Sequence, residues 1–185
     1  MKIEKTFIDG LLIISPDVYP DDRGYFFESY NFKRYSDNGL LVSFVQDNIS
    51  KSKYGTVRGL HYQVGKSAQG KLCSVILGRV LDVALDIRFG SPTFGKYFSL
   101  ELNDEEKNQF WIPSGFAHGF SVLSKEAIFS YKCTEHYNKE NERAILYNDS
   151  SINIDWKLDI PIVSQKDLQA KRFEEIEKDF IYQVQ

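Results

Sequence analysis

The 185-residue sequence has little of what marks membrane, secreted or nucleic-acid-binding proteins. No apolar run approaches the ~18 residues that a membrane-spanning helix needs, and Glu4 and Asp9 fall where a signal peptide would be apolar. No run of lysine and arginine exceeds two residues, and the formal net charge is −3, which argues against a polynucleotide partner. We therefore expect a cytoplasmic protein that binds neither membrane nor nucleic acid.

Cysteine is also scarce. Cys73 and Cys133 are the only two, and they do not form a CxxC pair. Two cysteines are too few for the disulfide framework of a small secreted domain. We expect both to be free thiols in the core.

What the sequence does contain is typical of a folded β protein. It is 42% hydrophobic and 26% charged, and a chain of this size buries roughly 70% of its unfolded surface. We therefore expect one domain over residues 1–185. Aromatic residues make up 15% of the chain, which favours β-sheet and also suits a pocket that stacks on rings.

Short alternating segments dominate the middle of the chain. In residues 80–88 the odd positions are apolar, whereas Asp82, Asp86 and Arg88 share the other face. Glycine, proline and asparagine recur between such segments at a spacing typical of a β-sandwich or barrel. The strands predicted in this way are 56–63, 71–78, 80–88, 96–102, 109–113, 119–123 and 127–134.

Helical patterns are few. A weak one lies at residues 31–39, and a strong one runs from Ser164 to Phe180. Ser164 followed three residues later by Asp167 matches a capping box, so we expect a C-terminal helix to begin there.

Only three histidines are present, and two have notable neighbours. His61 lies on a predicted strand with Arg58, ahead of Lys71, so a titratable base and two cations gather as they would around an anionic ligand. The alternative is a strand with exposed basic residues and one hydrogen-bonded histidine. His118 ends the PxGxxH spacing of the second cupin motif, whereas His136 has no such company and is expected on the surface or in a loop.

A metal cofactor is not expected. A metal site needs about three converging protein ligands, and the first cupin motif supplies two of them as an HxH pair. Here the equivalent run is His61-Tyr62-Gln63, so the second histidine is missing. The histidines are therefore candidates for acid–base chemistry.

A series of motifs gives the chain a family resemblance. Together they resemble the dTDP-4-dehydrorhamnose 3,5-epimerases over residues 5–170. This resemblance implies an all-β cupin jelly-roll barrel with short peripheral helices, forming homodimers without a metal or other cofactor. The motifs are DDRGYFFES near the start, FVQDN at 44–48, RGLHYQ at 58–63, AQGKL at 68–72, DVALDIR at 82–88, SPTFG at 91–95, IPSGFAHGF at 112–120, YKCTEHY at 131–137 and SQKD at 164–167.

The resemblance also implies a reaction, in which dTDP-4-dehydro-6-deoxy-D-glucose is inverted at C3 and C5 during synthesis of activated L-rhamnose. The C4 ketone acidifies both C–H bonds, so inversion needs a base, an acid on the opposite face and a group that stabilises the enolate oxygen. A monoepimerase or ketoisomerase on another nucleotide-linked 4-keto-6-deoxy sugar shares these motifs. A non-catalytic sugar-binding cupin would be expected to lack the base or the acid, and a metal-dependent oxygenase would be expected to have the HxH pair.

The resemblance implies specific catalytic roles. His61 is the base, Tyr131 the acid and Lys71 the neighbour of the developing oxyanion, while Asp167 holds the other nitrogen of His61. Asp167 is explained equally well as part of the capping box, and Asp82 is the alternative partner for His61. Tyr131 can also be an ordinary strand aromatic.

Binding the nucleotide is a separate task, to which the resemblance assigns further residues. Arginine forks suit a diphosphate. Arg23 has the alternative of a turn residue paired with its neighbours, and Glu28 and Glu142 that of solvated charges. The residues implied are Arg23, Arg58, His118 and Lys166 at the diphosphate, Glu28, Gln46, Asp47, Asn48, Lys71 and Glu142 at the nucleotide or sugar, and Tyr137 beside the sugar.

Overall fold

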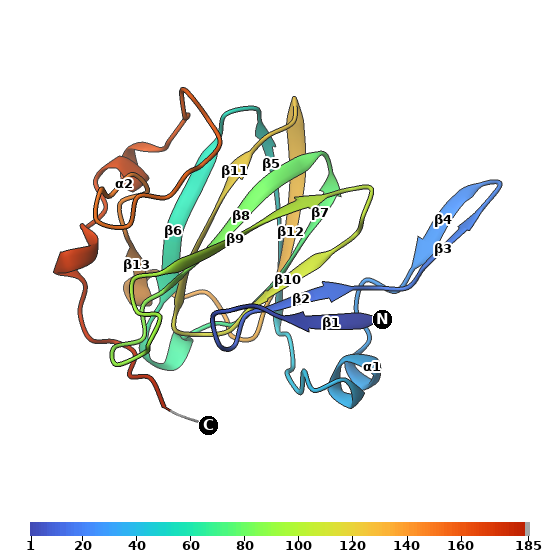
Figure 1. Ribbon diagram of the computed structural model, residues 1–185, viewed down its shortest axis with the longest axis horizontal. Coiled ribbons are helices and arrows are strands. Elements are labelled where there is room, and N and C mark those ends of the chain that lie inside the picture. Colours follow the sequence, from blue (N-terminus) through green and yellow to red (C-terminus); the bar gives the residue numbers. More distant parts are fainter. Residues whose placement is uncertain (184–185) are drawn as a thin grey trace.

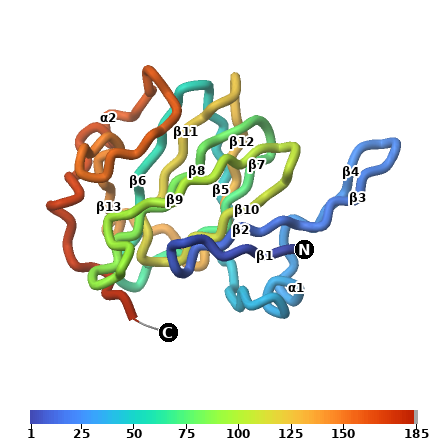
Figure 2. The backbone as a smooth tube through the Cα atoms, viewed as in Figure 1, coloured from blue at the N-terminus to red at the C-terminus, as the bar shows by residue number. Residues whose placement is uncertain are grey.

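A computed structural model describes residues 1–183 and consists mainly of two antiparallel β-sheets that face each other (Figures 1 and 2). The first has the strand order β1-β2-β10-β7-β12-β5, and the second β13-β6-β11-β8-β9. The first comprises β1 (Lys2–Lys5), β2 (Leu12–Ser15), β5 (Gln46–Lys53), β7 (Lys71–Leu77), β10 (Gln109–Ile112) and β12 (Glu126–Cys133). The second comprises β6 (Val57–Gln63), β8 (Arg79–Asp86), β9 (Tyr97–Asn103), β11 (Phe116–Val122) and β13 (Glu142–Ala144).

The predicted all-β jelly-roll architecture is confirmed, and each strand expected between residues 56 and 134 begins and ends within three residues of its predicted bounds. Both cysteines are buried free thiols, as expected. Helices are short: α1 (Phe32–Asp37), α2 (Gln165–Leu168) and the 3₁₀ turns η1 (Gly65–Ser67), η2 (Lys139–Asn141) and η3 (Phe173–Glu175). Within residues 1–183, no helix is long and apolar enough to cross a membrane.

Strand β8 is buried on both faces. Its even positions, including Asp82 and Asp86, point between the two sheets, although the sequence pattern suggested a polar face. Its odd positions pack under the C-terminal segment, where Trp156 and Phe173 join them in a second apolar cluster. The period of two is therefore right, but both sets of side chains are removed from water because the strand is covered on both sides.

The prediction of a long C-terminal helix is wrong over most of its length. Only α2 is α-helical, and the chain then runs irregularly over the outer face of the second sheet (Figure 1). Its backbone bonds to that sheet and its connections instead, since Leu146 N–H donates to Lys171 and Phe89 N–H to Phe180. These bonds and the apolar cluster outweigh the helical propensity of the segment.

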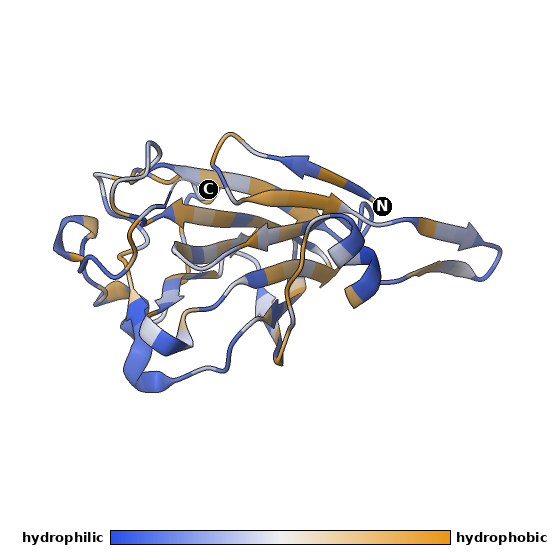
Figure 3. Cartoon of the chain, turned by 90° about the horizontal axis from the view of Figure 1, so that it is seen from below, coloured by the Kyte–Doolittle hydropathy of each residue, from blue (hydrophilic) through white to orange (hydrophobic). Residues whose placement is uncertain are grey.

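A two-stranded hairpin of β3 (Val18–Asp21) and β4 (Gly24–Phe27), the arm, extends away from the two sheets (Figures 1 and 2). Tyr19, Tyr25 and Phe26 on it are more than half exposed. Hydropathy colouring shows apolar segments on this hairpin as well as on the sheets (Figure 3). An isolated hairpin is marginally stable in water, and these rings form apolar surface that the rest of the chain leaves uncovered.

Two glycines bring β6 and β11 unusually close. A Cβ atom on Gly119 would lie 2.7 Å from the carbonyl oxygen of Arg58, and one on Gly59 would lie 2.5 Å from the Cα of Gly119. His61 and His118 are directly opposite each other on these same strands. Only glycine permits this approach, so the pair fixes the spacing of the two histidines.

We predict that Gly119→Ala lowers the free energy of unfolding by about 2 kcal/mol, because the methyl group forces the two strands apart. The displacement also moves His61 relative to His118, so activity falls with stability. Urea unfolding and turnover measure the two effects. The control is Gly65→Ala, whose Cβ would have no other atom within 4 Å. It should lower the free energy of unfolding by only about 1 kcal/mol, because alanine is strained at the positive φ of this position. Wild-type stability and turnover in Gly119→Ala would contradict the prediction.

Candidate active site

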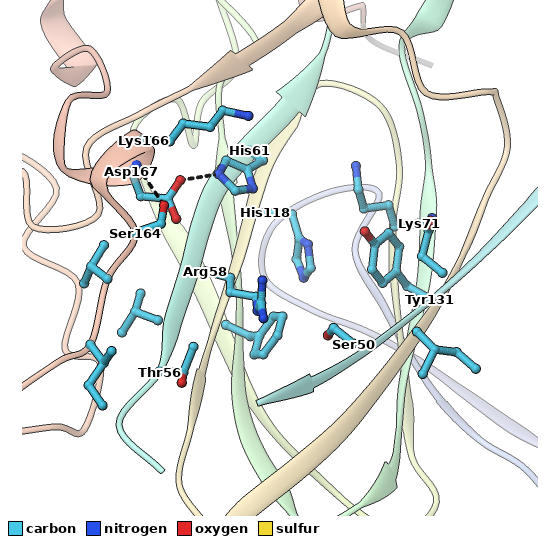
Figure 4. Close-up of a pocket in the computed structure, with 16 residues that line it drawn as sticks. Ser50, Thr56, Arg58, His61, Lys71, His118, Tyr131, Ser164, Lys166 and Asp167 are labelled. Atoms are coloured by element: carbon cyan, nitrogen blue, oxygen red, sulfur yellow. Dashed lines mark hydrogen bonds and ion pairs between the residues drawn. The ribbon is translucent and has the colours of Figure 1, made fainter. Parts of the chain in front are cut away.

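A cavity of about 580 Å³ opens between the two sheets (Figure 4). This volume is in the range of sites for small organic ligands, roughly 300–1,000 Å³. Most of its polar lining was predicted from the sequence. The predicted residues that line it are Asn48, Arg58, His61, Lys71, His118, Tyr131, Lys166 and Asp167.

Strand register explains why these residues meet. In the first sheet, Tyr131 lies opposite Asn48 on one side and Cys73 on the other, so the three form a row across β5, β12 and β7. In the second sheet, His61 lies opposite His118. Side chains paired across antiparallel strands point to the same face. The phenol of Tyr131 and the two imidazoles therefore enter the cavity from opposite walls (Figure 4).

His61 is oriented by Asp167. Its Nε2 lies 2.7 Å from Asp167 Oδ1, and Asp167 is only 3% exposed (Figure 4). Burial alone would raise the pKa of Asp167, but the hydrogen bond and charge of His61, with the Ser164 hydroxyl, bring it below its ordinary value. A carboxylate against one ring nitrogen fixes the tautomer and the orientation of the imidazole.

Only the Ser164 half of the predicted capping box is present at α2. The backbone N–H of Asp167 donates to Ser164 Oγ, which caps α2, while its carboxylate turns to His61. Asp82, the other possible partner for His61, instead lies 2.5 Å from His118 Nε2. Each active-site histidine therefore has its own carboxylate.

Tyr131 and Lys71 form the opposite wall (Figure 4). Burial raises the pKa of Tyr131 to about 12, so the phenol keeps its proton at neutral pH. Lys71 is 8% exposed, and burial lowers the pKa of its ammonium group. A protonated phenol facing a carboxylate-held imidazole gives the cavity an acid and a base on two sides.

Cationic and polar groups continue toward the mouth of the cavity. Arg58 is held by Ser52, whose Oγ accepts from Nε at 3.1 Å. Next to the cavity, a hollow of about 240 Å³ contains the predicted Gln46, Tyr137 and Glu142 and shares His61 and Tyr131 with it. Glu142 contacts the Tyr137 hydroxyl at 3.0 Å and Lys166 Nζ at 2.5 Å. These residues form one continuous polar surface with the catalytic candidates.

Three predicted residues line neither the cavity nor the hollow beside it. Arg23 is fully exposed at the tip of the arm and pairs with Asp21 at 2.6 Å. Glu28, at the base of the arm, lies 3.3 Å from Arg34. Asp47 lies on the outward face of β5 and contacts Lys132. His136 is exposed in a loop, as expected.

Sequence reasoning missed part of the lining. Along β5 the even positions face inward and are all polar, from Gln46 to Ser52, which is unusual for an inward face. This pattern was a usable signal for a cavity wall, and it includes Ser50, whose buried hydroxyl has no partner among residues 1–183. Other lining residues had no local signal, because only the fold brings them there. They are Ile49, Thr56, Val57, Phe120, Ile162 and Val163.

Comparison with known proteins gives consistent results. The family model described as dTDP-4-dehydrorhamnose 3,5-epimerase matches residues 5–175. A curated Shigella flexneri protein of that name is 52% identical over 94% of this chain and 96% of its own length. A Legionella pneumophila dTDP-6-deoxy-D-glucose-3,5-epimerase, solved in complex with dTDP-4-keto-L-rhamnose, is 50% identical with a TM-score of 0.95 and 99% of each chain covered. A 3′-monoepimerase from Streptomyces bikiniensis, solved with dTDP-quinovose, is 28% identical with a TM-score of 0.86, covering 91% of this chain and 86% of its own.

Proposed function

Since this chain belongs to the dTDP-4-dehydrorhamnose 3,5-epimerase family, we propose that it inverts C3 and C5 of dTDP-4-dehydro-6-deoxy-D-glucose to give dTDP-4-dehydro-L-rhamnose. One observation carries the proposal: a carboxylate-paired His61 and a protonated Tyr131 line one cavity from opposite sheets. Incubation with the dTDP-linked substrate tests it, with the configuration of the product assigned by NMR. Recovery of unchanged substrate would overturn the proposal.

The geometry supports a two-sided proton transfer. His61 removes the proton next to the C4 ketone, and the charge that develops on the imidazole is stabilised by Asp167. The electrons move into an enolate whose oxygen is met by the ammonium group of Lys71. Tyr131 then delivers a proton to the opposite face of the carbon, which inverts it. Repeating the sequence at the second carbon completes the reaction.

The charges of the cavity side chains indicate which residues bind the nucleotide end of the substrate. Arg58, fixed by Ser52, and Lys166 supply cations for a diphosphate, and His118 adds a donor. Gln46, Asn48 and Glu142 offer groups to sugar hydroxyls and base edges, and Tyr137 offers a ring beside them.

The family match over residues 5–175 supports a single domain for both catalysis and nucleotide binding. A cytoplasmic location stays a prediction.

A monoepimerase on a related dTDP sugar is the second candidate, favoured by the fold shared with the Streptomyces bikiniensis 3′-monoepimerase. His61 and Tyr131 serve either reaction, so these two residues do not separate them. Inversion at one carbon only, with the product configuration assigned by NMR, identifies this second activity.

We predict that Asp167→Asn lowers turnover by about 10²- to 10⁴-fold, because an amide cannot balance the charge of the imidazolium.

The effect of Asp167→Asn on the free energy of unfolding should depend on pH. Because the pKa of Asp167 is lowered in the folded chain, its ionised form stabilises the fold above about pH 4, and this contribution is lost as the pH falls through the folded-state pKa. The stability difference between wild type and variant should therefore shrink on acidification, as urea titrations can measure. A constant difference, or full turnover, would contradict the role.

We also propose that the protein is a homodimer in which the arm of one subunit completes the cavity of the other. Arg23 and Glu28 match nucleotide-binding positions, yet neither lines the cavity of its own chain. The arm that carries Arg23 projects away from the two sheets and exposes Tyr25 and Phe26 (Figure 1). A second copy of the chain would cover these rings and receive the arginine.

Mixed dimers test the arrangement. Arg23→Ala and His61→Ala, each alone, should be weakly active or inactive. A dimer that pairs the two variants, isolated by different affinity tags, has one cavity with an intact His61 and an intact Arg23 from its partner. We predict that this mixed dimer regains up to half of the wild-type turnover. Activity no higher than that of the parent variants would refute the exchange of arms.

A further inference from the structure

Three metal-ligating side chains converge at the floor of the cavity. They are Cys73 from β7, Asp82 from β8 and His118 from β11, and their ligand atoms all lie within 4.8 Å of one another. His118 Nε2 is 2.5 Å from Asp82 Oδ1 and 3.7 Å from Cys73 Sγ. All three residues are buried, and no other such group of three is present in residues 1–183. Asp82 and His118 come from neighbouring strands of one sheet, and Cys73 comes from the facing sheet.

A second observation concerns the carboxylate of Asp82. The residue is 0% exposed, and its Oδ2 has no hydrogen-bond partner among residues 1–183. A buried polar atom without a hydrogen-bond partner is costly. The proposed epimerisation does not use this oxygen or the Cys73 thiol. A ligand that binds both would remove the cost.

The spacing suits a tetrahedral ion with nitrogen and sulfur ligands. Zinc lies about 2.0 Å from an imidazole nitrogen and about 2.3 Å from a thiolate, so those two ligand atoms are about 3.6 Å apart around it. Cys73 Sγ and His118 Nε2 are already 3.7 Å apart. For an ion to fit between them, the distance between Asp82 Oδ1 and His118 Nε2 must increase by somewhat under an ångström. Thiolate and imidazole ligands select zinc, cobalt or cadmium over magnesium or calcium.

We propose that Cys73, Asp82 and His118 form an inhibitory site for a divalent transition-metal ion such as Zn²⁺. Binding releases the thiol proton of Cys73 and leaves His118 Nε2 unprotonated, so a thiolate and a carboxylate balance the charge of the ion. His118 lines the cavity, so an ion bound to it lies at the cavity wall. The cations of Lys71 and Arg58 line the same cavity and oppose the ion, so the site is weaker than a structural zinc centre.

Cobalt spectroscopy tests binding without any assay of activity. Wild-type protein titrated with Co²⁺ should develop a near-ultraviolet thiolate-to-cobalt band that saturates at one ion per chain. Cys73→Ala should lose the band, whereas Cys133→Ala, which removes the other buried thiol, should keep it. Absence of the band in wild type, or its survival in Cys73→Ala, overturns the site.

If Cys73→Ala does not fold, anomalous scattering from zinc-soaked wild-type crystals tests the site instead. A peak between Cys73 and His118 supports the site, and a peak elsewhere or no peak refutes it.

The inhibition rests on the proposed function, whereas the binding does not. Zn²⁺ should lower wild-type turnover, a chelator should restore it fully, and Mg²⁺ should have no effect. Cys73→Ala should turn over normally and resist Zn²⁺ by at least tenfold in concentration, while Cys133→Ala stays sensitive. Equal sensitivity of the two variants overturns the inhibitory role. Metal-free protein with no activity at all would count against the proposed function and leave the cobalt result as the test of the site.

Discussion

Replacing His61 by alanine should abolish proton exchange at both C3 and C5 while the protein remains folded. General-base catalysis of this kind contributes about 10²- to 10⁴-fold, and His118, the other histidine of the cavity, lies against Asp82. Asp167 stays buried in the variant without its partner, so a modest loss of stability accompanies the loss of rate. Exchange in deuterated water, followed by NMR, measures the rate, and circular dichroism measures the fold.

His136→Ala is the matched control, since it removes an exposed loop imidazole and should exchange both protons at the wild-type rate. A folded His61→Ala variant with near-normal exchange at either carbon would remove His61 from the reaction at that carbon.

Tyr131→Phe should separate exchange from inversion. The substitution keeps the ring and its packing but deletes the proton, which a pKa of about 12 keeps on the phenol at neutral pH. His61 can still form the enolate, because that step does not require the phenol. Deuterium should therefore enter C3 or C5 and return mostly to the original face, so that exchange outruns inversion. The ratio of exchange to inversion, compared with wild type, is the measurement.

Tyr35→Phe is the matched control for this variant. Tyr35 is almost completely buried, its pKa is raised by burial to about 12, and its hydroxyl donates to Gln109 away from the cavity. Its loss should cost about 1 kcal/mol of stability without changing the ratio. If Tyr131 is only an aromatic of the strand, Tyr131→Phe behaves like Tyr35→Phe. An unchanged ratio at undiminished rate would exclude the acid role.

Local patterns in the sequence predict the strands well and the C-terminal segment poorly. Alternation in residues 80–88 reports directly on a pleated strand, and β8 follows it. The run after Ser164 has helical periodicity, yet its apolar residues pack on a neighbouring sheet and its backbone bonds to that sheet's connections. Periodicity reports which residues are buried, but the surface they are buried against decides the backbone conformation.

The site was predictable only as far as its motifs extend. RGLHYQ and YKCTEHY contain the proposed base and the proposed acid, but nothing local chooses between Asp82 and Asp167 as the partner of His61. That choice depends on how α2 meets β6 and how β8 pairs with β11, which are contacts between distant segments. The unpartnered hydroxyl of Ser50 and the proximity of Cys73 to His118 likewise depend on contacts between distant segments.

Deuterium exchange by the wild-type protein tests the central claim most directly. The substrate is dTDP-4-dehydro-6-deoxy-D-glucose in deuterated water, and NMR follows C3 and C5. We predict deuterium at both carbons, with inversion at both, because one carboxylate-paired base and one acid on the opposite wall serve both positions. Exchange at neither carbon, by folded and metal-free protein, would contradict the account.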